Sequence, residues 1–186
     1  NSIFEPSQFS SAAKKYGLDF ETVILERCQL EKAKEGNAIT LQKLELMIDT
    51  ENGFLAASPD CGAKENRSLV GIVECKTVVK WSKKTVSECV KETTYPLKSV
   101  LINQNGNVRT IIKLKPSYAW YHQIQLQLFV YRYFSRYGDL VLLHPESSSF
   151  HCERIELNQE WVTKFFSKFE DFFKRYMAPK IVLKYK

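Results

Sequence analysis

Two short segments carry the residue types that phosphodiester hydrolysis requires. Asp60 follows Ser58 and Pro59, and Glu74 and Lys76 flank Cys75 further along the chain. Carboxylate oxygens hold the divalent cation that activates water in such reactions, and a nearby ammonium group offsets charge on the phosphate. Alternate side chains of a strand share a face, so Glu74 and Lys76 should lie side by side while Cys75 faces the other way. The spacing therefore predicts a cation site at this strand end.

A simpler interpretation competes with this one. A Pro-Asp pair and a Glu-x-Lys triplet meet by chance in many chains, where they form only a turn and a solvated strand end. However, the run 69–73 before Glu74 is apolar, which is typical of a strand buried on both faces. A charged pair that ends such a strand needs a partner or a metal ion. The buried strand before Glu74 therefore favours a cation site over a solvated strand end.

Length and composition indicate one folded domain over 1–186. The chain has 186 residues, of which 44% are hydrophobic, and no apolar run approaches the roughly 20 residues that span a bilayer. We expect a soluble chain with no membrane partner: N-terminal helices in 1–38, a catalytic sheet in 39–116, and a glutamine-bearing helix with C-terminal strands and helix in 117–186. The net charge of +6 suits a polyanion such as nucleic acid, although excess lysine is also common on ordinary surfaces.

The cysteines indicate the compartment. There are five, an odd number, and none forms a C-x-x-C pair of the kind found in zinc or redox motifs. No secretory signal is evident at the start of the sequence. Free thiols in a reducing, intracellular compartment, nucleus or cytoplasm, are the expectation.

The chain before Asp60 is predicted to begin with helices. A helical pattern covers 7–36, and a break is expected at Tyr16-Gly17 because glycine commonly ends helices. Glu21 shares one helical stripe with three apolar residues, which directs its carboxylate inward. The alternative is a glutamate of the first helical turn that bends out to water.

A hairpin is predicted to deliver Asp60. Residues 39–49 alternate between apolar and polar side chains, 50–53 form a turn, and a second strand leads to the acid. We expect a polar loop over 61–68, followed by the buried strand that ends at Glu74.

A basic loop comes after this strand. Lys80, Lys83 and Lys84 surround Trp81, and a short helix is expected over 85–91. Such a loop beside a metal site can bind phosphates and stack on a base. Equally often it is merely solvated, so both interpretations stay open.

A second hairpin and a long helix follow. Residues 97–114 contain an Asn-Gly turn, and 117–137 show an apolar helical pattern. Gln123 and Gln127 lie within an apolar stripe of that helix, whereas Gln125 points elsewhere. A buried glutamine can be a satisfied core residue, or it can reach a bound water or phosphate oxygen.

The C-terminal part is predicted to form two strands, 139–144 and 151–157, and a helix capped by Asn158. The three histidines lack the spacing of a metal triad. The aromatic stripe of the final helix is expected to pack in the core; its members are Trp161, Phe165, Phe169, Phe172 and Tyr176.

Four motifs, in order, resemble the YqaJ-like viral recombinase family, the phage lambda exonuclease-type branch of the PD-(D/E)XK nucleases. The first is a helix with a glutamate, the second Ser-Pro-Asp, the third a strand that ends Glu-x-Lys, and the fourth a helix with Gln-x-Gln. In this chain they are Gly17–Glu21, Ala57–Asp60, Gly71–Lys76 and Tyr121–Gln125. The resemblance covers most of the chain and implies an α/β restriction-endonuclease-like fold, a central mixed β-sheet flanked by α-helices.

The resemblance also implies a chemistry. Asp60, Glu74 and the main-chain carbonyl of Cys75 would hold Mg²⁺ or Mn²⁺, with Glu21 reaching the ion directly or through water, while Lys76 and Gln123 orient the nucleophile. The expected activity is that of a deoxyribonuclease, an exonuclease that leaves 5′-phosphates and acts in DNA recombination or repair. The expected partners are double- or single-stranded DNA and further copies of the chain in a homo-oligomer. The residues expected to contact DNA are Ser58, Lys80, Trp81, Lys83, Lys84, Tyr121 and Gln125.

The chain departs from the family at two places. Cys61 stands where the family has glycine after the acid, and the family's phosphate-binding arginine and serine near the start have no clear counterpart. Recognition of a 5′ end is therefore open. The alternatives are an endonuclease or structure-specific nuclease of the same fold, and an inactive module that binds nucleic acid or protein.

Overall fold

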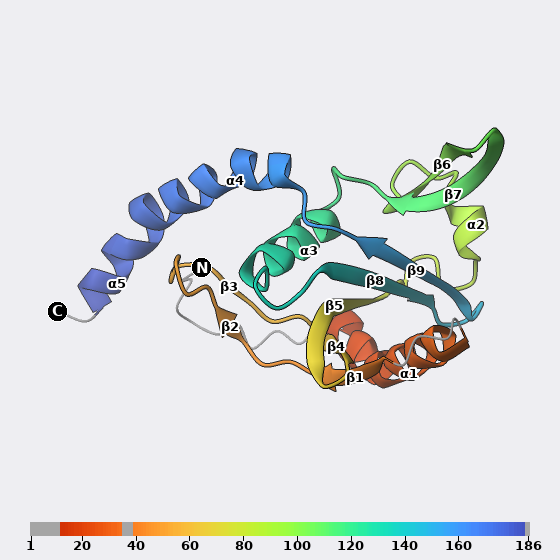
Figure 1. Ribbon diagram of the computed structural model, residues 1–186, viewed down its shortest axis with the longest axis horizontal. Coiled ribbons are helices and arrows are strands. Elements are labelled where there is room, and N and C mark those ends of the chain that lie inside the picture. Colours follow the sequence, from red (N-terminus) through yellow and green to blue (C-terminus); the bar gives the residue numbers. More distant parts are fainter. Residues whose placement is uncertain (1–11, 35–38, 185–186) are drawn as a thin grey trace.

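A five-stranded mixed sheet forms the centre of the protein (Figure 1). The structure is a computed structural model that describes residues 12–34 and 39–184. The strand order is β1 (Thr40–Lys43), β4 (Cys61–Glu65), β5 (Ser68–Thr77), β8 (Tyr137–His144) and β9 (Ser149–Ile155). β5 and β8 are parallel, and the other neighbours are antiparallel.

Helices cover both faces of this sheet. α1 (Ala12–Lys34) lies on one face and α3 (Ala119–Val130) on the other (Figure 1). The remaining elements are β2 (Met47–Ile48), β3 (Ala56–Ala57), α2 (Val86–Cys89), β6 (Leu97–Gln104), β7 (Asn107–Leu114), α4 (Gln159–Phe172), the π-helical turn η1 (Phe173–Met177) and α5 (Ala178–Lys184). None of the helices in the described parts of the chain combines the length and apolar character that a membrane crossing requires.

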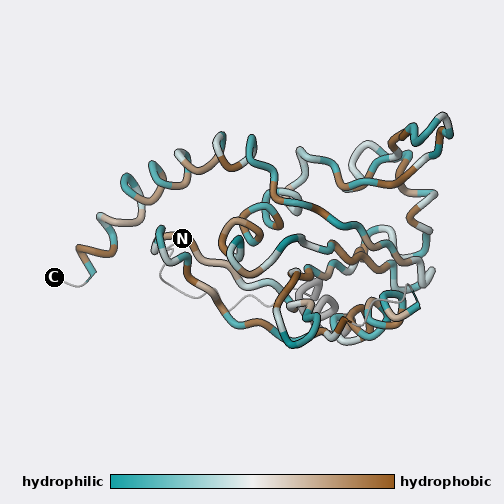
Figure 2. The backbone as a smooth tube through the Cα atoms, in the orientation of Figure 1, coloured by the Kyte–Doolittle hydropathy of each residue, from teal (hydrophilic) through white to brown (hydrophobic). Residues whose placement is uncertain are grey.

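The core has two halves, because successive residues of β5 and β8 point to opposite faces. Ile72 and Leu140 pack with Ile124 on the α3 side, whereas Val73 and Val141 pack with α1. Every residue of β8 is buried, as expected for a central strand with helices on both faces. Figure 2 shows apolar residues along α3 and the central strands. The same alternation sends Glu74 toward α3 and Cys75 toward α1.

The polar loop predicted for 61–68 is wrong. Residues 61–65 form β4, which pairs with β1 and β5, and the turn shrinks to Asn66 and Arg67, which both have positive φ. Small side chains permit this packing: a Cβ on Gly62 would lie 2.5 Å from the Leu69 side chain. The polar residues of the segment favoured a loop in the sequence, although its first residues are small and form a buried strand.

The predicted helix break at Tyr16-Gly17 is also wrong, because α1 runs unbroken from Ala12 to Lys34. The ends of the predicted pattern, 7–11 and 35–36, lie outside the described residues. The single strand predicted over 39–49 is instead two strands, β1 and β2, which belong to different sheets. The Tyr131 hydroxyl donates a 3.0 Å hydrogen bond to the Glu45 carbonyl in the segment between them.

Two expectations about helices need correction as well. α3 ends at Val130, and Tyr137 already belongs to β8, so the helix predicted over 117–137 is shorter than expected. Asn158 caps α4 as predicted, accepting a 3.0 Å hydrogen bond from the Trp161 N–H. Trp161 is buried, but Phe172 and Tyr176 are 50% and 56% exposed, so the core role predicted for these two is wrong. α4 and α5 extend away from the sheet (Figure 1).

Candidate active site

Glu74 is the buried centre of a polar cluster between β5 and α3. Its side chain accepts hydrogen bonds from three donors: Lys76 Nζ and Gln123 Nε2, each 2.5 Å from Oε1, and Gln127 Nε2, 2.7 Å from Oε2. Glu74 is only 4% exposed, and a buried carboxylate is costly unless it is paired in this way. Strand alternation brings Lys76 to the same face, and helical spacing brings Gln123 and Gln127 to one side of α3.

Lys76 is fixed from two directions. Its ammonium group pairs with Glu74 and lies 5.9 Å from the centre of the Trp120 ring, within the range of a cation–π contact. Trp120 belongs to the first turn of α3, so the start of this helix forms one wall around the lysine.

Asp60 approaches the same end of β5 from the residue before β4. Its Oδ2 accepts a 2.7 Å hydrogen bond from the Cys75 N–H. Burial, and next the negative charge of Glu74, raise the pKa of Asp60 to about 6, against the opposing effects of that hydrogen bond and of Lys76. The two carboxylates are therefore near enough to repel each other, and a cation between them would relieve that repulsion.

Glu21 and Cys75 belong to the α1 side of the sheet. The charge of half-buried Glu21 contributes to the raised pKa of Asp60 and, more weakly than burial, to that of the Cys75 thiol. The Cys75 pKa lies far above its ordinary range, so the thiol stays neutral at neutral pH. Cys75 contacts Asp60 through its main-chain N–H, and the carbonyl ligand predicted for it stays a prediction.

The donor set fits a hard divalent cation. Mg²⁺ is commonly bound through one or two carboxylates while it keeps several waters, and Asp60 and Glu74 supply such a pair. Within the described residues, no three His, Cys, Asp or Glu side chains are grouped to hold a metal ion. A role of Glu21 at the ion, directly or through water, therefore stays a prediction.

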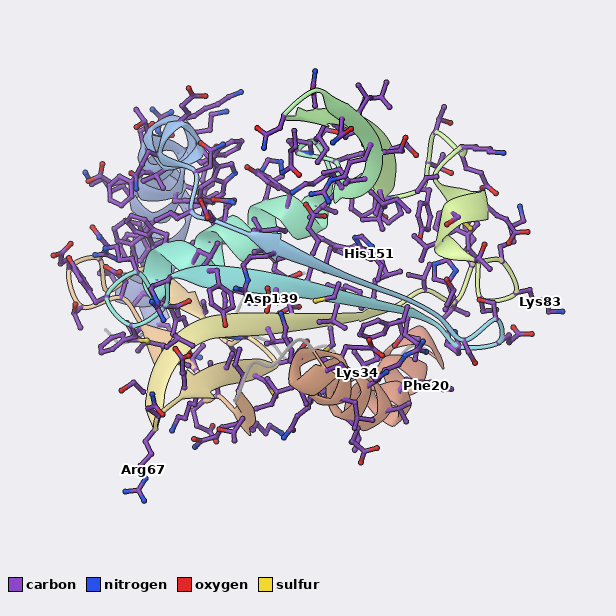
Figure 3. All side chains as sticks on the ribbon, turned by 45° about the vertical axis from the view of Figure 1, so that its right-hand side comes forward. Phe20, Lys34, Arg67, Lys83, Asp139 and His151 are labelled. Carbon is purple, nitrogen blue, oxygen red and sulfur yellow. The ribbon has the colours of Figure 1, made fainter. Side chains whose placement is uncertain are left out.

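The basic loop lies beyond the end of β5, and its side chains bond to nearby glutamates. Trp81 Nε1 and Lys84 Nζ bond to Glu92 at 2.6 and 2.7 Å, and Lys80 lies over the Trp81 ring. Lys83 pairs loosely with Glu146, at 3.9 Å, and points outward (Figure 3). None of the four forms a hydrogen bond or ion pair with Asp60 or Glu74 in the described part of the chain, and their DNA contacts stay predictions.

Of the other predicted DNA contacts, the one assigned to Gln125 is wrong. Its side chain is fully buried, with Nε2 donating to the Glu156 carbonyl at 2.9 Å and Oε1 accepting from the Asn158 N–H at 2.8 Å. It therefore joins α3 to the chain entering α4. Ser58 is exposed two residues before Asp60, and half-buried Tyr121 lines a groove between β9 and the β6–β7 hairpin, so both are accessible.

Gln127 was missing from the predicted site residues. Its position in an apolar stripe left both a core role and a site role open. Its amide donates to Glu74, and its Oε1 is buried without a partner among the described residues. The signal that identifies it is its spacing: Gln127 follows Gln123 by one helical turn and therefore reaches the same carboxylate.

No protein-family model matches the chain, and no curated protein matches it by sequence. Solved structures that share its fold include an alkaline exonuclease, LHK-Exo, from Laribacter hongkongensis. It is 19% identical, with a TM-score of 0.65, and the match covers 96% of this chain and 75% of that one. A structure of LHK-Exo in complex with dAMP matches with the same identity and coverage and a TM-score of 0.66. The likeness confirms the predicted α/β restriction-endonuclease-like fold, with its central mixed sheet flanked by helices.

Proposed function

We propose that this chain is an Mg²⁺- or Mn²⁺-dependent deoxyribonuclease, an exonuclease that leaves 5′-phosphates. The observation that carries the proposal is the meeting of Asp60, Glu74, Lys76 and Gln123 at one end of β5, although they come from separate segments. A binding protein has no need for a buried carboxylate paired with a lysine beside a second acid. The shared fold with an alkaline exonuclease supports the same reaction class.

Each residue has a distinct task in this proposal. When bound by Asp60 and Glu74, a divalent cation supplies a more acidic water and stabilises charge on the phosphate. Gln123 and Gln127 hold the Glu74 carboxylate in one orientation. Lys76, fixed against Glu74 and Trp120, positions the attacking water and offsets negative charge as the bond from phosphorus to the 3′ oxygen breaks.

Digestion of end-labelled DNA with Mg²⁺ tests the proposal. An exonuclease should degrade linear DNA to mononucleotides with 5′-phosphates and leave covalently closed circles intact. Cleavage of the circles would establish the endonuclease alternative, and no cleavage of any substrate would favour the binding module. The same reactions with separate 5′ and 3′ labels, on single and double strands, report direction and strand preference.

Gln127 is expected to matter because it holds one oxygen of Glu74. The Gln127→Leu variant should cleave about ten- to a hundredfold more slowly, the range typical when a partner of a metal ligand is lost. Because α3 is otherwise undisturbed, circular dichroism should show the same helix content. Rates at saturating Mg²⁺ and the Mg²⁺ concentration at half-maximal rate are the measurements.

Gln125→Leu is the matched control for that variant. It removes an equally buried amide from the same helix, but one that bonds Glu156 and Asn158 rather than Glu74. It should lower the unfolding free energy by about 1–3 kcal/mol through unpaired main-chain groups, yet keep the cleavage rate per folded molecule. Equal rate losses in both variants would refute the specific role of Gln127.

The wider assignments are proposals as well. The order of the four motifs supports membership of the YqaJ-like branch, with a role in DNA recombination, repair or viral DNA processing. All five cysteines are free thiols, which supports an intracellular, reducing compartment.

A further inference from the structure

The segment between the basic loop and β8 has an uneven charge. From Thr93 to Gly138 there is no aspartate or glutamate, although six basic residues occur there: Lys98, Arg109, Lys113, Lys115, Arg132 and Arg136. The segment includes β6 and β7, which pair with each other in a two-stranded sheet of their own. This ribbon stands out from the central sheet at the upper right of Figure 1. A long acid-free stretch on a protruding ribbon favours a polyanionic partner.

The register of the ribbon gathers its cations on one face. Lys98 lies directly opposite Lys113, and Ile102 lies opposite Arg109. Directly paired residues share a face, and so do alternate residues along a strand. Lys98, Arg109 and Lys113 therefore project from the same side of the ribbon, with aliphatic side chains between them.

This arrangement opposes the stability of the ribbon itself. Like charges directly opposite each other on paired strands are destabilising. Lys113 is partly compensated by Glu153, at 3.6 Å, but neither Lys98 nor Arg109 forms an ion pair with any residue that the structure describes. Positions that break a local rule of stability are commonly functional.

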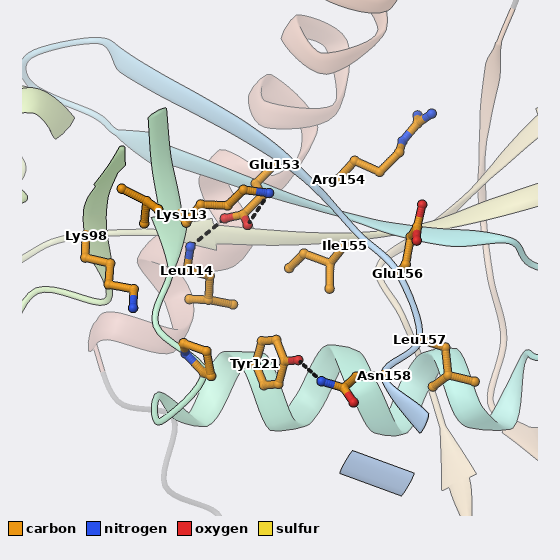
Figure 4. Close-up of a pocket in the computed structure, with 12 residues that line it drawn as sticks. Lys98, Lys113, Leu114, Tyr121, Glu153, Arg154, Ile155, Glu156, Leu157 and Asn158 are labelled. Carbon is orange, nitrogen blue, oxygen red and sulfur yellow. Dashed lines mark hydrogen bonds and ion pairs between the residues drawn. The ribbon is translucent and has the colours of Figure 1, made fainter. Parts of the chain in front are cut away.

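The basic face of the ribbon lines a groove. A cavity of about 750 Å³ lies between the ribbon, β9 and the start of α3, and Lys98 and Lys113 line it together with Tyr121 (Figure 4). The Glu153 carboxylate in its wall is already engaged, because it accepts a 2.6 Å hydrogen bond from the Leu114 N–H and lies near Lys113. Glu156, just after β9, is a second carboxylate in the lining, so free positive charge is confined to the ribbon side.

Tyr121 places one wall of this groove one residue along α3 from Trp120. It belongs to the same turn of α3 as Trp120, which packs against Lys76. The Tyr121 hydroxyl accepts a 3.2 Å hydrogen bond from Asn158 Nδ2, which fixes the ring as part of the groove wall. The groove therefore begins on the side of α3 that adjoins Trp120.

We propose that the groove binds a single strand of the DNA substrate beside the site of cleavage, a proposal that rests on the proposed nuclease function. Lys98, Arg109 and Lys113 contact successive phosphates, and the half-buried ring of Tyr121 offers a face on which a base stacks. The cavity is of the size of ordinary small-ligand sites, which suits a few nucleotides of one strand rather than a duplex.

Binding in the absence of metal tests this proposal. A fluorescent oligothymidylate and a hairpin duplex of equal length are titrated in EDTA, by anisotropy, at several salt concentrations. The test variant is Lys98→Ala/Arg109→Ala. Its matched control, Arg67→Ala/Lys180→Ala, removes the same charge from the β4–β5 turn and from α5, away from the ribbon. Arg67 projects into solvent at the opposite side of the molecule (Figure 3).

The test variant should bind the single strand at least about tenfold more weakly at low salt. The slope of log K against log salt should fall by about 1.4, because each lost phosphate contact on a single strand contributes about 0.7. The control should keep the wild-type slope. Equal losses in both variants, no loss in either, or a loss confined to the duplex would each overturn the proposal.

This outcome is separable from that of the proposed function. If the wild type binds the single strand through Lys98 and Arg109 but never cleaves DNA, the proposed groove stands and the proposed nuclease function is refuted. If the wild type cleaves DNA but the ribbon variant and its control bind the single strand equally well, the proposed nuclease function stands and the proposed groove is refuted.

Discussion

The Glu74→Gln variant is expected to cleave DNA at least about a thousandfold more slowly than the wild type. The substitution keeps the size of the side chain but removes the charge that would hold the cation, and about 4 kcal/mol of lost transition-state stabilisation corresponds to this factor. The thermal unfolding midpoint should stay nearly unchanged or rise, because relief of the repulsion between Glu74 and Asp60 offsets the lost charge of the ion pair with Lys76. Single-turnover cleavage with Mg²⁺ and thermal unfolding in EDTA are the measurements.

Lys76→Ala distinguishes the role of the ammonium group in cleavage from the role of the carboxylates in cation binding. It should also abolish cleavage, but cation binding should persist or strengthen, because Glu74 then loses the ammonium group 2.5 Å from its Oε1. Glu65→Gln and Lys64→Ala are matched controls at the far end of β4 and should cleave normally. Activity retained in both the Glu74 and the Lys76 variants would refute the assignments.

The second large effect is a stability that depends on pH and on the cation. In EDTA, the contribution of Asp60 should fall as pH rises from about 4 to about 7. The reason is that its pKa in the folded state is about 6, above the ordinary value of 3.8 for an aspartate, so the folded protein holds this proton more tightly than the unfolded chain. That contribution is fully present below about 3.8 and is lost as pH rises through about 6.

Mn²⁺ should reverse this loss, because it binds the ionised carboxylate. With the ion at about a hundredfold excess over its dissociation constant, the unfolding midpoint at pH 7.5 should rise by roughly 5–10 °C, which corresponds to about 2.7 kcal/mol. At pH 5 the rise should fall to about half, because only about a tenth of the Asp60 carboxylates are then ionised. Thermal melts across pH 5–7.5, with and without Mn²⁺, measure both effects.

Asp60→Asn is the control that isolates this group. The difference in melting temperature between wild type and variant in EDTA should follow a titration near pH 6, and Mn²⁺ should no longer stabilise the variant. A difference that does not change with pH, or equal Mn²⁺ stabilisation of both proteins, would show that the cation binds elsewhere.

The sequence was sufficient for the parts of the fold that follow from periodicity. The apolar run before Glu74 predicted the buried β5, and the Asn-Gly turn predicted the β6–β7 hairpin, which is confirmed. Strand alternation predicted that Glu74 and Lys76 share a face, and their 2.5 Å ion pair confirms this geometry.

Tertiary contacts decided what periodicity missed. β4 begins with small residues that read as a loop, and only its neighbours β1 and β5 make it a strand. Gln125 and Gln127 are alike in sequence, yet one bonds main-chain groups near α4 and the other bonds Glu74. Which partner a buried amide finds depends on elements distant in the chain, and no local pattern contains that information.

Titration calorimetry of Mn²⁺ into the metal-free protein at pH 7.5 measures whether Asp60 and Glu74 together bind a cation. The wild type should bind Mn²⁺ with a measurable heat at millimolar concentrations or below, and Glu74→Gln and Asp60→Asn should each abolish that heat while remaining folded. No heat in the wild type at millimolar Mn²⁺, or undiminished binding in both variants, would contradict a cation site built from these two acids.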